Sequence, residues 1–387
     1  MIKRQITEKL LLLSTKFPVV TITGPRQSGK TTIAKYVFSN YDYVSLENPD
    51  IRLLAVEDPK GFLQNHPDKC IIDEIQQVPE LLSYIQTIVD NEKIKGRFIL
   101  TGSQNLLLSE KVSQSLAGRT AIMRLLPLNC SELRQHHGFD KITYEEHIFK
   151  GSYPAIHNDN IKPGDFYPAY LETYIQRDVR KIQNIRNLMT FTTFIKLCAG
   201  RNGQIIDLSS LASDAGISIN TAKEWISVLE ASYIIFMLHP YYKNFSKRLI
   251  KTPKLYFYDT GLAAFLLGIE NKEQLSTHYL KGGLFENHII LELLKQRYNS
   301  GKQTNIYYWR DNKKNEIDCI IDGATPKALE IKSGKTFTKE YLKMEKYWLR
   351  TTTFEKDSFS LVYGGDESFS FLGTKILGWR DFCEHLQ

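Results

Sequence analysis

The sequence predicts an α/β protein that begins with a parallel β-sheet covered by helices on both faces. The first third of the 387-residue chain alternates apolar runs with helical stretches: PVVTITG, a helix from Lys30, YDYVSLE, KCIIDEI, a helix near Pro79 to Val89, and GRFILTGS. Such alternation is typical of parallel strands joined by helical crossovers. From about residue 140 longer helical segments follow, and after about residue 280 strands and helices alternate again.

The length and composition favour a globular protein of two or three domains. A chain of 387 residues exceeds what one hydrophobic core usually organises. Its 42% hydrophobic and 24% charged residues are typical of such proteins. The apolar run Leu10 to Leu13 is far shorter than the roughly 18 residues of a membrane span, and it is too short for a signal peptide. We therefore expect a cytoplasmic protein that does not bind membranes.

The cysteines and the net charge further limit the kinds of site that the sequence predicts. Five cysteines are scattered without C-x-x-C spacing and without a neighbouring pair of histidines. This argues against a disulfide framework and against a zinc site. The formal charge of +7 is modest for this length, so it does not by itself indicate nucleic acid.

Residues 24–31, GPRQSGKT, match the phosphate-loop pattern G-x-x-x-x-G-K-[ST] between an apolar strand, Val19 to Thr23, and a helix. Glycines let backbone N–H groups surround phosphates, Lys30 reaches the β- and γ-phosphates, and the Thr31 hydroxyl ligates Mg²⁺. The pattern thus predicts ATP and Mg²⁺ as ligands. The residues expected to bind the nucleotide are Gly24, Pro25, Arg26, Gln27, Ser28, Gly29, Lys30, Thr31, Thr32, Asp73 and Ser103.

Two later strands end in polar groups suited to the same site. CIIDE ends in Asp73 and Glu74, an arrangement in which the first carboxylate holds Mg²⁺ and the second polarises the attacking water. An acidic pair at a strand end is usually a solvated turn, but its position about forty residues after the loop favours catalysis. The strand Phe98 to Leu100 leads to Ser103 and Gln104, which either sense the γ-phosphate or form a simple turn.

These motifs resemble a prokaryotic family of AAA-type P-loop ATPases that carry a winged helix and a restriction-endonuclease-like C-terminal domain. The resemblance rests on GPRQSGKT, IIDEIQ, LTGSQ and SLAGRT, and it continues through YIQRDVR, TPKLYFYDTGL, LFEN, YYWRD, EID and EIKSG. It implies the roles given above, with Ser103 or Gln104 as sensor. We predict an ATPase core at 1–140, a helical lid at 141–200, a winged helix at 201–260 and a nuclease-like domain at 261–387.

Two arginines are candidates for completing the nucleotide site. Arg119, in SLAGRT, is the candidate arginine finger, because P-loop enzymes commonly borrow such a cation from a neighbouring subunit. That role implies a homo-oligomer, and the alternative is an exposed arginine at a helix end. Arg177, in YIQRDVR, would sense nucleotide from the lid, or belong to a solvated ion pair.

Residues 204–240 predict the helix-turn-helix part of the winged helix, with Leu211 before Gly216 and Trp225 after it. The segment Tyr241 to Lys254 holds five basic residues, three aromatic ones and no acidic one. That composition is typical of a wing that binds a nucleic-acid backbone. The alternatives are a solvated hairpin, or a wing that packs against the ATPase core or a neighbouring subunit.

A third group of residues resembles the core of PD-(D/E)xK nucleases, although Ile317 replaces the initial proline. Asp318 lies in one predicted strand, and Glu330 and Lys332 share a face of the next. Carboxylates on adjacent strands can hold a hard cation, with Glu286 of the preceding helix as a third ligand. Lys332 would stabilise the phosphorane or activate water. The domain either cleaves nucleic acid or only binds it or a protein.

The sequence therefore predicts a Mg²⁺-dependent AAA-type ATPase coupled to a nuclease-like domain that interacts with DNA. The alternative is a nucleotide-dependent switch that binds a regulatory protein partner and cleaves nothing. A small-molecule kinase is disfavoured because no second substrate-binding motif is visible.

Overall fold

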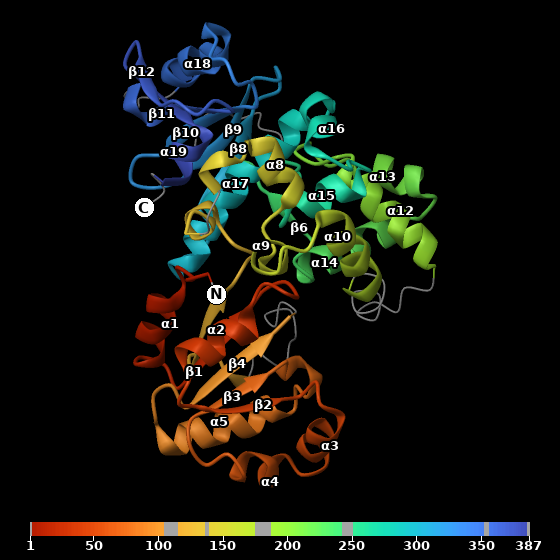
Figure 1. The fold of residues 1–387 in the computed structure, drawn as a ribbon, viewed down its shortest axis with the longest axis vertical. Helices are drawn as coiled ribbons and strands as arrows, with labels where there is room; N and C mark the ends of the chain where they lie inside the picture. The colour runs from red at the N-terminus through yellow and green to blue at the C-terminus, as the bar shows by residue number, and fades with distance from the viewer. Residues whose placement is uncertain are drawn as a thin grey trace. The chain divides into compact units, whose positions relative to one another are not determined.

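The computed structural model describes residues 2–103, 115–135, 139–174, 187–241, 251–351 and 356–384. The chain divides into two compact units. In Figure 1 the colour follows the residue number from red at the N-terminus to blue at the C-terminus. Unit 1 comprises residues 1–128, 231–233 and 297–303, and unit 2 comprises the remainder. The sensor alternative Gln104, the lid candidate Arg177 and residues 242–250 of the expected wing lie outside the described residues.

Unit 1 contains a five-stranded sheet with all neighbouring strands parallel, in the order β2-β3-β4-β1-β5. The sequence did not indicate its edge strand β5, but the parallel sheet itself is confirmed. The strands are β1 (Val19–Thr23), β2 (Asp42–Ser45), β3 (Cys70–Asp73), β4 (Phe98–Gly102) and β5 (Thr120–Arg124).

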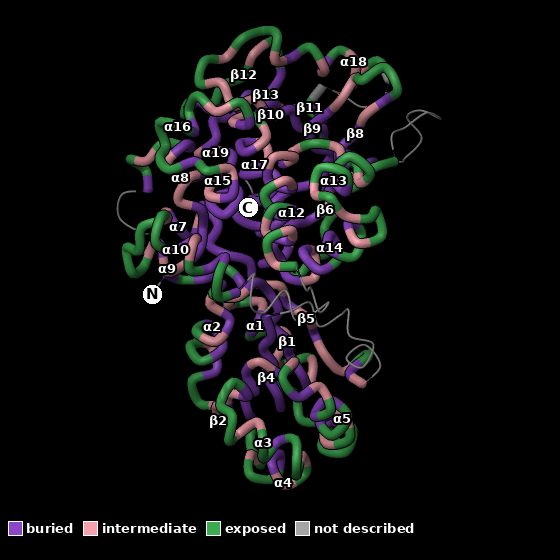
Figure 2. Tube along the Cα trace, turned by 90° about the vertical axis from the view of Figure 1, so that its right-hand side faces the viewer, coloured by how far each residue is buried: buried purple, intermediate pink, exposed green. Residues whose placement is uncertain are grey.

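Helices cover both faces of this sheet, as predicted. Because side chains alternate along a strand, Val19 of β1 joins one apolar cluster, with residues of α5, while Val20 joins another, with residues of α1 and α2. Figure 2 shows that the outer turns of α3 and α4 are exposed. The helices are α1 (Thr7–Ser14), α2 (Lys30–Val37), α3 (Pro49–Glu57), α4 (Pro59–Gln64) and α5 (Leu81–Glu92).

The first part of unit 2 is helical and ends in a two-stranded antiparallel hairpin. The helix α13 stops at Gly216, whose φ of 66° suits a residue without a side chain. The rings of Phe191 and Phe194 pack edge-on against Trp225, which fixes α12 on α14. The elements are α7 (Cys130–Leu133), α8 (Tyr144–Lys150), α9 (Pro154–Asn158), α10 (Pro163–Tyr170), α12 (Leu188–Ala199), α13 (Leu208–Ala215), α14 (Ile219–Ala231), β6 (Ile235–Leu238) and β7 (Lys254–Phe257).

The second part of unit 2 is a six-stranded mixed sheet in the order β12-β13-β11-β10-β9-β8. Its strands β8 to β11 lie after residue 280, where the sequence predicts that strands and helices alternate. The elements are α15 (Thr260–Leu266), α16 (Lys272–Thr277), α17 (Lys281–Asn299), β8 (Ile306–Arg310), β9 (Glu316–Ile321), β10 (Lys327–Lys332), α18 (Lys343–Thr351), β11 (Phe359–Tyr363), β12 (Phe369–Phe371), β13 (Thr374–Gly378) and α19 (Trp379–Glu384). Among the described helices, none combines the length and the hydropathy of a membrane span.

Candidate functional site

The phosphate loop connects β1 to α2 through three residues with left-handed backbone. Gly24, Gln27 and Gly29 have φ values of 151°, 62° and 93°. A Cβ at Gly24 would lie 2.1 Å from the carbonyl oxygen of Leu125, so only glycine fits there. Because α2 begins at Lys30, the free N–H groups of its first turn lie at the end of the loop. The loop therefore has the backbone that phosphate binding requires.

Lys30 is buried and its Nζ donates to the carbonyl oxygen of Pro25 at 2.8 Å. Burial lowers the pKa of this ammonium from its usual value to about 8, although Glu74 and Asp73 act in the opposite direction. An anionic phosphate beside Lys30 would stabilise its charged form. Elsewhere in the loop, Ser28 is buried and Arg26 pairs with Glu47 at 3.3 Å. Pro25 is also buried, whereas Thr32 faces solvent.

Asp73 and Thr31, the predicted magnesium ligands, are in contact. The Thr31 hydroxyl lies 3.0 Å from both carboxylate oxygens of Asp73, whose side chain is buried. The hydroxyls of Tyr43 and Thr101 also donate to this carboxylate. Burial and the neighbouring Asp73 raise the pKa of Tyr43 to about 12, so its phenol stays a donor. Sequence reasoning missed Tyr43, which lies on the adjacent strand β2.

The structure brings Glu74 together with Ser103, the candidate sensor. The Glu74 φ of 56° is left-handed, a conformation that is uncommon for a residue with a side chain and that recurs at functional sites. The Oε2 atom of Glu74 accepts hydrogen bonds from the Ser103 hydroxyl at 3.1 Å and from the Gln76 amide. The backbone N–H of Glu74 donates to the Thr101 hydroxyl at 3.2 Å. Gln76 and Thr101 were not predicted.

The strand order explains why these groups meet. Strand β4 lies between β1, which leads into the phosphate loop, and β3, which leads into the acidic pair. Parallel strands end at the same edge of a sheet, and this edge is where α/β proteins bind their ligands. Ser103 directly follows β4. Its strand is therefore flanked by β1, which leads to Lys30, and by β3, which leads to Glu74.

A buried arginine far from the motif supports the loop. Arg4 donates through Nη1 to the carbonyl oxygen of Ser28 at 2.8 Å and through Nη2 to that of Leu126 at 2.6 Å. It is 6% exposed, so its charge is balanced by fixed carbonyl dipoles in place of water. The sequence MIKRQ gives no sign of this role, because a single arginine has no periodic or motif signal.

Arg119 lies at the amino-terminal end of the strands, whereas the phosphate loop lies at their carboxyl end. The Val19 N–H, at the start of β1, donates to the carbonyl oxygen of Arg119, whereas the loop follows the end of that strand. Five residues of strand correspond to about 16 Å. The guanidinium of Arg119 pairs with Asp90 of α5 at 2.6 Å. Arg119 therefore does not complete the site of its own chain, and its role as a finger for a second copy stays a prediction.

We expect Arg119→Ala to retain ATP affinity and to lose hydrolysis by on the order of 10³-fold, because a finger acts on transition-state charge and not on the bound ground state. Mixing this variant with Lys30→Ala should restore some activity through a shared interface. Asp90→Ala is the matched control, since it removes the ion pair but keeps the cation. Full activity in a strictly monomeric protein would remove Arg119 from this role.

In unit 2 the structure gathers the residues predicted for a nuclease-like site. Asp318 of β9 accepts hydrogen bonds at Oδ2 from the Ile331 N–H at 2.8 Å and from Lys332 Nζ at 3.3 Å. Lys332 also contacts Glu330 Oε1 at 2.5 Å. Glu286 reaches the same region from α17 and interacts electrostatically with Asp318. We call Glu286, Glu316, Asp318 and Glu330 the acidic centre.

The acidic centre has the features of a divalent-cation site. Burial raises the pKa of Glu286 and of Glu330, and the Asp318 carboxylate raises both further. The Oε2 atom of Glu330 is buried and has no hydrogen-bond partner. A desolvated carboxylate oxygen beside other carboxylates is stabilised by a hard cation. Carboxylates of this kind are ligands of Mg²⁺ or Mn²⁺, and the binding of such an ion here stays a prediction.

The structure corrects the prediction that the segment Tyr241 to Lys254 binds nucleic acid along its whole length, because both of its ends are buried. Lys254, on β7, is 2% exposed and lies inside the acidic centre, where its Nζ is 2.9 Å from Glu286 Oε1 and 2.5 Å from Glu316 Oε1. Tyr241 is also buried, and its hydroxyl donates to Asp322 at 3.1 Å. Neither residue is available to nucleic acid. Their local sequence is basic and aromatic, and it gave no sign that acidic partners lie far along the chain.

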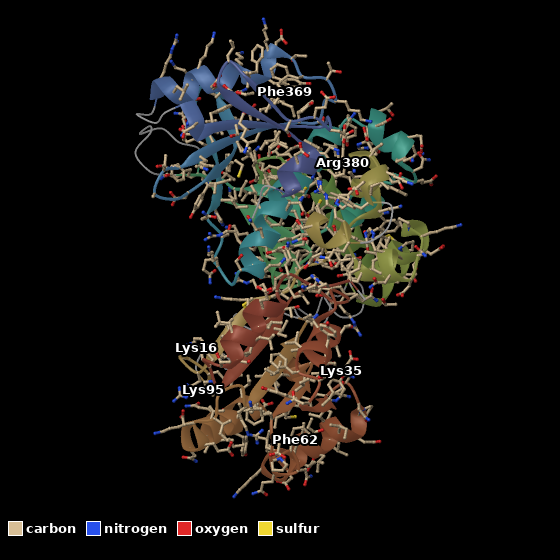
Figure 3. The ribbon with its side chains drawn as sticks, turned by 60° about the vertical axis from the view of Figure 1, so that its left-hand side comes forward. Lys16, Lys35, Phe62, Lys95, Phe369 and Arg380 are labelled. Carbon is tan, nitrogen blue, oxygen red and sulfur yellow. The ribbon has the colours of Figure 1, made fainter. Side chains whose placement is uncertain are left out.

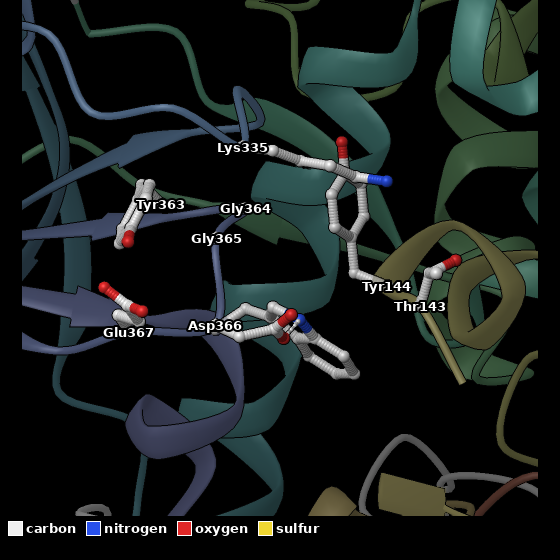
Figure 4. Close-up of a pocket in the computed structure, with 9 residues that line it drawn as sticks. Thr143, Tyr144, Lys335, Tyr363, Gly364, Gly365, Asp366 and Glu367 are labelled. Atoms are coloured by element: carbon white, nitrogen blue, oxygen red, sulfur yellow. Dashed lines mark hydrogen bonds between the residues drawn. The ribbon is translucent and has the colours of Figure 1, made fainter. Parts of the chain in front are cut away.

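Unit 2 also contains a pocket of about 330 Å³ outside the acidic centre. Figure 4 shows Tyr144 and Lys335 on one side of it and Tyr363 and Glu367 on the other. The Tyr144 hydroxyl donates to the Ser333 carbonyl oxygen at 2.6 Å. No residue predicted from the sequence lines this pocket.

Comparisons with known proteins agree with the first site. Residues 16–134 match a family described as "AAA domain", and residues 141–273 and 281–382 match two families described as domains of unknown function (DUF8612 and DUF4143). An uncharacterized Mycobacterium tuberculosis protein is 27% identical over 86% of this chain and 74% of its own length. An uncharacterized Methanocaldococcus jannaschii protein is 24% identical over 95% of this chain and 88% of its own.

Among solved structures, a Walker-type ATPase of Pyrococcus abyssi aligns with a TM-score of 0.46 and 12% identity, over 69% of this chain and 96% of its own. The family match and the parallel sheet identify residues 16–134 as an AAA domain of the P-loop ATPase type.

Proposed function

We propose that this chain, whose residues 16–134 form an AAA domain of the P-loop ATPase type, hydrolyses ATP with Mg²⁺ and thereby controls a nuclease-like unit that acts on DNA. One observation carries the first half of the proposal. Asp73 contacts Thr31 while the adjacent Glu74 contacts Ser103, so the two residues proposed to hold Mg²⁺ lie beside the two proposed to orient the water.

In the ATPase reaction, the loop N–H groups and Lys30 would bind the β- and γ-phosphates. Thr31 and Asp73 would hold Mg²⁺, which neutralises charge that develops on the phosphate oxygens. Glu74 would accept the proton of the attacking water, and Ser103 would hold the Glu74 carboxylate in position. Such a site performs in-line phosphoryl transfer to water, and ADP and phosphate are the products.

In unit 2, Glu286, Asp318 and Glu330 would hold Mg²⁺ or Mn²⁺, which would polarise a phosphodiester and lower the pKa of a water. Lys332 would donate to a phosphate oxygen as negative charge builds up there. The helix pair α13–α14 with the hairpin β6–β7 has the order of a winged helix, which we propose as the contact to DNA. Support for this half is the convergence of residues from α17, β9 and β10.

The decisive experiment uses the purified full chain on supercoiled plasmid and on single-stranded DNA. Reactions contain Mg²⁺, Mn²⁺ or a chelator, each with and without ATP. We expect nicking that requires a divalent cation and that changes with nucleotide. If no combination yields cleavage and the protein binds no divalent cation outside the ATP site, then unit 2 is not a nuclease.

One observation favours the alternative, a nucleotide-dependent switch that recognises a protein partner without cutting. The Lys254 ammonium already pairs with two carboxylates of the acidic centre, Glu286 and Glu316, and so supplies positive charge there without a metal. Slow ATP turnover, no stimulation by DNA and ATP-dependent capture of a protein would together favour the switch.

A further inference from the structure

Four helices of unit 2 bring two cysteines and two histidines into one buried cluster. The Sγ atom of Cys130, on α7, lies 3.8 Å from His147 Nε2 of α8 and 3.9 Å from His288 Nε2 of α17. Cys383, on α19, lies on another side of Cys130, and its Sγ is within 4.8 Å of the Cys130 Sγ. All four side chains are buried.

Three of these residues, Cys130, His147 and His288, offer ligand atoms that all lie within 4.8 Å of one another, close to the spacing of a tetrahedral metal site. Zinc lies about 2.3 Å from cysteine sulfur and about 2.0–2.1 Å from histidine nitrogen, so neighbouring sulfur and nitrogen ligands are about 3.6 Å apart. The two S···N distances exceed this value by only a few tenths of an ångström. The Cys383 side chain would turn from its place beside Cys130 toward the two histidines to complete the set around an ion.

Glu292, the nearest carboxylate to the two cysteines, already accepts from the Cys130 N–H at 2.8 Å and from Lys295 at 2.9 Å. The remaining donors are therefore two thiols and two imidazoles, which are the ligands that zinc prefers.

We propose that Cys130, His147, His288 and Cys383 form a structural site for Zn²⁺. Binding breaks the two S–H bonds, and both protons leave to solvent as the thiolates bind the metal. Two thiolates balance the charge of Zn²⁺, and burial favours the neutral imidazoles that act as ligands by lowering the pKa of both histidines. The ion thus adds no net charge to the core. Four protein ligands leave no position for substrate, so the site is structural.

The site would fasten the C-terminal helix to the rest of unit 2. Trp379, the first residue of α19, stacks near His147 with ring centroids 6.1 Å apart. Arg380, labelled in Figure 3, donates to the carbonyl oxygens of Phe139 and Ile142. Since Trp379 also lines the 330 Å³ pocket, loss of the metal would loosen one wall of that pocket.

The test begins with the metal content of the full chain, purified under reducing conditions without an affinity metal. We expect about one Zn²⁺ per chain. Co²⁺ exchanged into the site should give thiolate-to-cobalt charge-transfer absorption and should quench the fluorescence of Trp379. Cys383→Ser should lose both signals and most of the zinc. Cys198→Ser is the matched control, because Cys198 is an equally buried helical cysteine remote from the cluster.

A second measurement does not depend on whether a variant folds. Removing zinc from the wild-type chain with a chelator should lower the midpoint of thermal unfolding by on the order of 5–10 °C, and added Zn²⁺ should restore it. Reduced protein without bound metal and without cobalt–thiolate absorption would overturn the proposal. So would a Cys130–Cys383 disulfide, detected in the denatured chain as three titratable thiols instead of the five of the sequence.

Discussion

Glu74→Gln is expected to bind ATP as the unchanged protein does and to hydrolyse it about 10²–10⁴-fold more slowly. The amide oxygen still accepts the hydrogen bond that Ser103 donates, so the local geometry is kept. The amide cannot take the proton of the attacking water. Single-turnover hydrolysis, measured beside the affinity for a labelled nucleotide, separates these two effects.

Lys30→Ala should instead abolish tight ATP binding, because it removes the buried cation that would contact the phosphates. Glu47→Gln is a suitable control, since Glu47 is an exposed carboxylate that pairs with Arg26 and has no assigned catalytic role. Undiminished turnover in Glu74→Gln would show that another group accepts the proton.

Lys332→Ala is expected to eliminate metal-dependent nicking of DNA, by at least about 10²-fold, and to leave ATP hydrolysis unchanged. Lys332 contacts both Asp318 and Glu330, whereas the phosphate loop belongs to unit 1. Lys335→Ala is the matched control, because Lys335 is a nearby lysine whose ammonium pairs with Glu145 instead. Equal nicking by the two variants would remove Lys332 from the reaction.

Cation binding by the acidic centre can be measured separately from DNA cleavage. Replacing Asp318 by Asn and Glu330 by Gln together should weaken divalent-cation binding, measured by calorimetry in a Lys30→Ala background that silences the ATP site. Burial and the Asp318 carboxylate raise the pKa of Glu330, and a protonated carboxyl binds cations poorly. Binding should therefore tighten as the pH rises. Divalent binding that is independent of pH and of both substitutions would contradict the assignment.

The nucleotide site could be predicted from the sequence because its main residues belong to short contiguous motifs. Lys30 and Thr31 lie in one loop, and Asp73 and Glu74 end one apolar strand. The role of Arg4 could not be predicted. Its partners are backbone carbonyl oxygens far along the chain, and every residue has such an oxygen, so the sequence does not mark them. Tyr43 and Gln76 were missed for a related reason, because an isolated polar side chain near a strand end gives no signal of its own.

In unit 2 the order helix, strand, strand and the resemblance to PD-(D/E)xK nucleases pointed to Glu286, Asp318 and Glu330, which the structure places close enough to interact electrostatically. The burial of Lys254 was not foreseeable, because it ends a run of basic residues that resembles a solvated surface. The proposed zinc site would escape the cysteine spacing rule, which argued against zinc. Such rules detect zinc ligands that are close in sequence. Cys130 and Cys383 lie near the first and the last residue of unit 2 in the sequence, and they approach each other only in the folded structure.

The boundaries of the ATPase unit have a practical consequence for anyone who wishes to excise it. The matched family interval begins at residue 16, yet Arg4 supports the phosphate loop and Leu10 fills the core beneath α2. The unit also includes a short segment around Tyr233, whose hydroxyl is 2.9 Å from the Thr23 hydroxyl at the end of β1. A gene fragment cut at the family borders would leave these anchors behind. The ATPase unit is therefore not a contiguous cassette: residues 231–233 and 297–303, which follow long stretches of unit 2 in the sequence, belong to its fold.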